Sequence, residues 1–174
     1  MLNVSVQTHD LSQHDRRDDL IAGGIAGQIA GLVMAGVMMA VFALFLGKSP
    51  LFPVQVIGSF IFGDVAVQGG LHVPSLLAGL ALHQLGASLF WGVVFALLAH
   101  TLNLRATGAL VLAGLGIGVV SQVIDVNLLI PPIFTALHGH DIWTEQVPAF
   151  WSWAAHLVFG VTLATFGWVR PKIG

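Results

Sequence analysis

Three side chains that can take up or release a proton stand within apolar stretches of the sequence. His83 lies in LALHQLGASLFWG, His156 in SWAAHLVFGV and Asp125 in SQVIDVNLLI. Imidazole and carboxylate groups can form hydrogen bonds between helices, ligate a metal or relay protons. Because an ionisable group in hydrocarbon is costly unless it is paired or hydrated, each of the three is a candidate functional residue.

The composition predicts that membrane-spanning helices carry these residues. Of the 174 residues, 56% are hydrophobic and only 8% are charged, and the mean hydropathy is +0.91. These values are typical of integral membrane proteins. A bilayer core is crossed by about 20 apolar residues, and the segments that meet this length are 20–46, 75–100, 106–130 and 149–169. We therefore predict an all-α, four-helix membrane bundle.

Domain organisation follows from these spans. Residues 20–174 form a single transmembrane domain, and the polar residues 1–19 are expected to be a disordered cytoplasmic tail. The positive-inside rule places both ends of the chain in the cytoplasm of a bacterial inner membrane, because five of the six basic residues lie on one side of the spans. These five are Arg16, Arg17, Arg105, Arg170 and Lys172, whereas Lys48 lies on the other side.

Both exterior loops carry partly apolar stretches. Residues 51–67 form an apolar run too short for a span, and we expect a re-entrant or interfacial helix there. The loop PPIFTALHGHDIWTEQVP is its expected counterpart. His83 lies nine residues after Pro74 and His156 eight after Pro148, so we further expect a two-fold internal repeat of two-span units.

Small residues at intervals of four predict close helix packing. The first span has Gly23, Gly27 and Gly31, and the third has Gly114 and Gly118. Such rows let helix backbones approach in lipid. Because His83 and His156 lie in similar rows, we expect both rings to face protein.

Helix rise places the polar residues in one layer of the outer half of the bundle. His83 and His156 lie roughly 12 to 14 Å below the exterior end of their spans, and Asp125 roughly 9 Å below Pro131. Gln122 and Asn127 belong to the same predicted polar layer.

Four interpretations of this layer stay open. The residues can be structural hydrogen-bonding groups. His83 and His156 can be the two axial ligands of haem b, since two imidazoles on separate helices suit that ligation. His83, His156 and Asp125 can hold a divalent metal, or the same three can relay protons.

A second candidate metal site lies in the loop LHGHD. His138, His140 and Asp141 are close in sequence and could chelate a metal weakly, although such residues also suit a solvated polar turn.

Two classes of function are disfavoured by the sequence. It has no cysteine, no G-x-S-x-G elbow, no P-loop and no H-E-x-x-H motif, so we expect a protein that is not an enzyme. The net charge is −2 and the sequence has no basic cluster, so it lacks the positive charge that nucleic-acid binding requires.

The chain resembles small uncharacterised four-helix bacterial inner-membrane proteins, some of which are labelled as symporters. The resemblance rests on GIAGQIAGLVMAGVMMA, SPLFP, LHQLGASLFWGVVFALL and AHLVFGVTLATFGW. It implies an architecture and a cellular location, and it brings no catalytic residues.

Two functions are consistent with these observations. The first is an accessory or structural subunit of a larger membrane complex, such as a respiratory one, or a self-associating protein. The alternative is a small oligomeric transporter or channel for protons or metal ions past His83, His156 and Asp125.

Overall fold

The computed structural model describes residues 3–173, with side chains from Asp15 onward, and this part of the chain is all α-helical without strands. The predicted all-α class is therefore confirmed. The helices are α1 (Asn3–Leu44), α2 (Phe52–Phe62), α3 (Val73–Ala81), α4 (Leu89–Thr101), α5 (Thr107–Ser121), α6 (Ile130–His138), α7 (Ile142–Gln146), α8 (Ala149–Thr162) and α9 (Phe166–Val169). Short 3-10 segments are η1 (Gly63–Ala66), η4 (Leu163–Thr165) and η5 (Arg170–Lys172), and the π-helical segments are η2 (Leu82–Ser88) and η3 (Gln122–Leu129).

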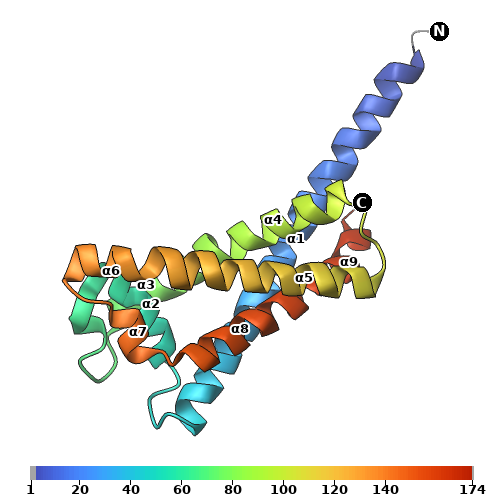
Figure 1. Cartoon of the computed structure of the whole chain (residues 1–174). Helices are drawn as coiled ribbons and strands as arrows, with labels where there is room; N and C mark the ends of the chain where they lie inside the picture. Colours follow the sequence, from blue (N-terminus) through green and yellow to red (C-terminus); the bar gives the residue numbers. More distant parts are fainter. Residues whose placement is uncertain (1–2, 174) are drawn as a thin grey trace.

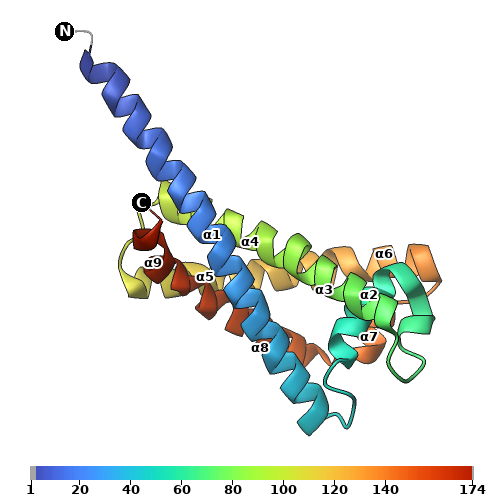
Figure 2. The ribbon, with the colours of Figure 1, turned by 180° about the vertical axis from the view of Figure 1, so that it is seen from behind.

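Four continuous helices are long and apolar enough to cross a membrane, as predicted. They cover Asp15–Leu44, Val73–Thr101, Thr107–His138 and Ala149–Lys172, and we refer to them as the first to fourth long helices. In Figure 1 α1 extends beyond the bundle at its N-terminal end, while the C-terminus lies near the turn between α4 and α5. Seen from behind, α1 crosses α4 and α8 (Figure 2).

The third long helix ends eight residues later than residue 130, the predicted end of this span. Pro131 and Pro132 follow this predicted end, and proline usually ends a helix because it removes a hydrogen-bond donor and clashes with the preceding turn. Instead the π-helical segment η3 stands directly before them. A π segment widens the turn and shifts the hydrogen-bond register, so the chain passes both prolines as a helix. The apolar part of the second exterior loop is therefore α6, an extension of the third helix, rather than a separate interfacial segment.

The loop between the first and second long helices does contain the short apolar helix that we expected. It covers Phe52–Ala66, as α2 and η1, and packs closely on α3, where a Cβ on Gly79 would lie 2.9 Å from the Gly58 nitrogen. Gln55, which is 2% exposed, holds the following loop. Its Nε2 donates to the carbonyls of Ala66 and Gly70, and its Oε1 accepts from the His72 nitrogen.

Glycine contacts assemble the long helices into two close pairs. A Cβ on Gly23 of α1 would lie 2.6 Å from the Gly92 carbonyl oxygen of α4, and one on Gly114 of α5 would lie 3.0 Å from the Gly160 carbonyl carbon of α8. The predicted glycine rows therefore face neighbouring helices, where the absence of a side chain permits close approach.

A charged cluster closes the end of the bundle that holds the C-terminus. Asp19, with a side chain 1% exposed, accepts from Arg170 Nε at 2.8 Å and lies 2.7 Å from His100 Nδ1 and 3.6 Å from Arg105 Nη2. Asp15 accepts from Arg170 Nη2 at 2.7 Å. We call these five residues the Asp19 cluster. At the end of the predicted tail, Asp18 and Asp19 are thus buried in the bundle, whereas residues 15–17 are exposed.

Candidate functional site

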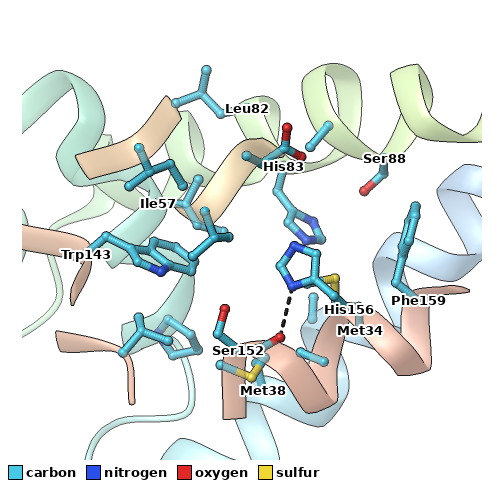
Figure 3. A pocket seen from close by; sticks show the side chains of 18 of the residues that line it. Met34, Met38, Ile57, Leu82, His83, Ser88, Trp143, Ser152, His156 and Phe159 are labelled. Carbon is cyan, nitrogen blue, oxygen red and sulfur yellow. Dashed lines mark hydrogen bonds between the residues drawn. The ribbon is translucent and has the colours of Figure 1, made fainter. Parts of the chain in front are cut away.

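A cavity of about 260 Å³ lies between α2 and the halves of the long helices that are far from the Asp19 cluster. Its walls are mainly apolar, and the three candidate residues of the sequence, His83, Asp125 and His156, all line it. Figure 3 shows side chains that line this cavity, with the two histidines among them. The cavity is also lined by Leu80 of α3, Leu82, Ala87 and Ser88 of η2, Trp91 of α4, Phe134 of α6, Trp143 of α7 and Phe159 of α8.

His83 and His156 reach the cavity from different long helices, and their rings point toward one another (Figure 3). His156 is 8% exposed, and its Nδ1 lies 2.9 Å from the Ser152 carbonyl oxygen. Since a carbonyl can only accept, Nδ1 carries the proton in this bond. In the neutral ring Nε2 is then left as a hydrogen-bond acceptor.

Asp125 is held by an indole from the second long helix. Trp91 Nε1 donates to Asp125 Oδ2 at 2.6 Å, and Trp91 is 6% exposed. The bond links the second and third long helices at the cavity and occupies one of the two carboxylate oxygens. The other oxygen can accept a further hydrogen bond. The sequence does offer one signal for this partner, because a buried indole N–H usually has an acceptor.

Gln122 and Asn127 belong to a separate hydrogen-bonded chain between the third and fourth long helices. Ser152 Oγ donates to Gln122 Oε1 at 2.8 Å, and Gln122 Nε2 donates to Asn127 Oδ1 at 3.0 Å. Neither Gln122 nor Asn127 lines the cavity. The predicted polar layer is therefore divided into cavity residues and residues that link helices.

Both π-helical segments coincide with the cavity. His83 lies in η2, and Asp125 lies in η3. Interruptions of this kind frequently occur at functional sites, because they change which side chains a helix presents. The periodicity of the sequence did not reveal the two π-helical segments. The two prolines after η3 are nevertheless a signal that the helical hydrogen-bond pattern changes near them.

The arrangement does not suit a metal centre of the predicted composition. Among the described residues, no group of three or more His, Asp or Glu side chains is placed to hold a metal ion. His83, His156 and Asp125 share a cavity without converging as three ligands.

Ligation of haem b stays a prediction. His83 and His156 both line the cavity, as two axial imidazoles from separate helices would. The volume of about 260 Å³ lies below the range of about 300–1,000 Å³ for pockets that enclose drug-sized ligands, so a porphyrin would have to extend beyond the cavity.

The second candidate metal site is also dispersed. His138 Nε2 lies 3.2 Å from the Phe60 carbonyl oxygen, and Asp141 caps α7 by accepting from the Thr144 nitrogen at 3.2 Å. His140 instead contacts two acidic side chains that we had not grouped with it. Its Nδ1 lies 2.8 Å from Glu145 Oε1, and its Nε2 lies 3.1 Å from Asp64 Oδ1. Hydrogen bonds to both carboxylates raise the pKa of His140 above its usual 6.5.

Comparisons with known proteins add no assignment to this geometry. No protein-family model, no curated protein and no solved structure matches the chain.

Proposed function

We propose that the protein is a multi-pass protein of the bacterial inner membrane that binds a small molecule in its cavity and serves as a non-enzymatic subunit of a larger membrane assembly. The observation that carries this proposal is the cavity itself. Side chains from different long helices bring His83, Asp125 and His156 into one apolar enclosure, and a few polar groups in an apolar pocket are typical of ligand sites.

Charge distribution supports the orientation. Arg105 and Arg170 belong to the Asp19 cluster, and Lys172 lies two residues beyond Arg170, whereas Lys48 follows the other end of the first long helix. The positive-inside rule then places the Asp19 cluster in the cytoplasm and the loops with α2 and α7 outside. Because the chain has no cysteine, single cysteines test this directly. We expect Lys48→Cys to react with an impermeant maleimide in intact cells, and Lys172→Cys to react only after permeabilisation.

Native mass spectrometry tests ligand binding. The full chain, extracted from its own membranes in mild detergent, is expected to carry a bound small molecule that Ala87→Phe removes, because Ala87 lines the cavity and is exposed. Leu112→Ala, on the exposed surface of α5, is the control and should retain the molecule. Equal occupancy in all three proteins, or none in any, would refute the proposed binding. Other subunits retained in the same spectra would identify the assembly, and a chain that always extracts alone would argue against a subunit role.

Proton transfer is the second candidate, and the facing imidazoles of His83 and His156 favour it. It predicts proton flux in proteoliposomes that falls in the His156→Ala, Asp125→Asn double variant. Flux equal to that of protein-free liposomes would eliminate this candidate and leave ligand binding unaffected.

A further inference from the structure

Three apolar residues of the second long helix, Leu80, Leu82 and Ala87, line the cavity and are also exposed. We take them as the mouth of the cavity, which then lies along the length of this helix. Leu80 lies seven residues into its helix, about 10 Å from the exterior end. In the proposed membrane orientation this mouth opens to lipid hydrocarbon. A ligand that enters here must therefore dissolve in the bilayer.

The volume sets the size of the part that is enclosed. An engineered apolar cavity of about 150 Å³ binds benzene, so about 260 Å³ accommodates one substituted six-membered ring. A long tail does not fit beside such a ring and would leave through the mouth. The aromatic walls, from Trp91, Trp143, Phe134 and Phe159, provide faces and edges against which a ring can pack.

Two polar groups of the cavity, on His156 and Asp125, can accept hydrogen bonds from a ligand. His156 Nε2 is an acceptor because Nδ1 donates to Ser152, and Asp125 keeps one oxygen that Trp91 does not occupy. The two acceptors belong to different long helices. They suit a ligand that donates two hydrogen bonds from separate positions of one ring.

We propose that the cavity binds the dihydroxy ring of a membrane-soluble quinol, with its hydroxyl groups donating to His156 and Asp125 and its tail passing between η2 and η3. This inference rests on the proposed function, since it requires the cavity to be a ligand site in a membrane. It specifies the chemical class of that ligand. The oxidised quinone, whose two carbonyl oxygens only accept, is expected to bind more weakly.

Binding of decylubiquinol to the full chain in lipid nanodiscs, under anaerobic reducing conditions, tests the proposal. Fluorescence of the tryptophans, two of which line the cavity, reports occupancy. We expect saturable binding that is at least tenfold weaker for decylubiquinone and undetectable for 1-decanol, which tests the tail alone. His156→Phe removes one acceptor and should weaken quinol binding at least tenfold.

Two further variants keep the test decisive if His156→Phe fails to fold. Ala87→Phe narrows the mouth from an exposed position and should also weaken binding at least tenfold, whereas Leu112→Ala should bind as the wild type does. Equal affinity for quinol and quinone, or quinol binding unchanged by Ala87→Phe, would overturn the quinol assignment. If a native molecule that is sensitive to Ala87→Phe is found by mass spectrometry while decylubiquinol does not bind, only the quinol class fails. If no native molecule is found and decylubiquinol does not bind, the proposed function fails as well.

Discussion

Arg170 lies 151 positions after Asp19 in the chain, yet its Nε donates a hydrogen bond to Asp19 Oδ1 over 2.8 Å. The aspartate side chain is 1% exposed, whereas that of the arginine is 25% exposed. His100 and Arg105 approach the other carboxylate oxygen. The last turn of the fourth long helix is thereby fixed to the first long helix and to the turn after α4.

Replacing Asp19 with Asn should destabilise the protein strongly. The change removes the negative charge that compensates Arg105 and Arg170, and loss of one partner from a buried ion pair costs about 3 kcal/mol or more of unfolding free energy. Asp15→Asn is the matched control, because Asp15 binds the same arginine from a side chain 63% exposed, and exposed pairs contribute at most about 1 kcal/mol. Reversible unfolding in mixed micelles measures both. Equal losses would show that burial does not govern this cluster.

Trp91→Phe should destabilise the outer half of the bundle. Phenylalanine keeps an aromatic ring but leaves the Asp125 carboxylate without its indole donor, and an unsatisfied buried polar group costs about 1–3 kcal/mol. Trp153→Phe serves as the control, since Trp153 is half-buried and does not line the cavity. Thermal unfolding followed by tryptophan fluorescence compares the two variants. A midpoint for Trp91→Phe no lower than that for Trp153→Phe would contradict the role of this hydrogen bond.

Gly114→Ala should separate α5 from α8. The added Cβ would meet the backbone of Gly160, and overpacking of this kind costs about 1–3 kcal/mol. Gly116→Ala, two residues along the same helix, meets nothing within 4 Å and should leave stability unchanged or slightly higher. Unfolding in a graded series of denaturing detergent distinguishes them. Similar stability of both variants would argue against close packing of this pair.

The link between His140 and its two carboxylates should depend on pH. Because the pKa of His140 is raised in the folded protein, its protonation stabilises the fold fully below the ordinary value of about 6.5. This stabilisation is lost as the pH rises through the raised pKa. We therefore expect the difference in melting temperature between the wild type and His140→Gln to be largest near pH 6 and to shrink toward pH 9.

Asp64→Asn provides the check on the cause of that shift. Removing one of the two acidic partners should lower the midpoint of the His140 titration, followed by NMR of the imidazole protons. An unchanged midpoint would mean that Asp64 does not contribute.

Hydropathy and small-residue spacing predicted most of the fold. All four long helices were placed from length and apolar composition, and the glycine rows of the first and third were assigned to helix contacts that the structure contains. The end of the third long helix was predicted wrongly. Pro131 normally ends a helix, but here the helix continues through it after the π-helical segment η3.

The candidate site was predicted in its residues but not in its partners. The sequence identified His83, His156 and Asp125, because an ionisable residue within an apolar stretch can be seen without knowledge of the structure. The donor from Trp91, the grouping of Asp64 with His140 and the closure around Asp19 depend on which helices lie side by side. Such contacts between distant segments leave no local pattern in the sequence.

The π-helical segments also set the rotational phase of the helices that contain them. One additional residue in a turn rotates everything beyond it by about 100° relative to an uninterrupted α-helix. The inner half of the second long helix can therefore present Gly92 and Ala96 to α1, while the outer half turns His83 into the cavity. Deleting a single residue within η2 would remove this offset, and the close helix contact and the cavity lining could then no longer be satisfied together.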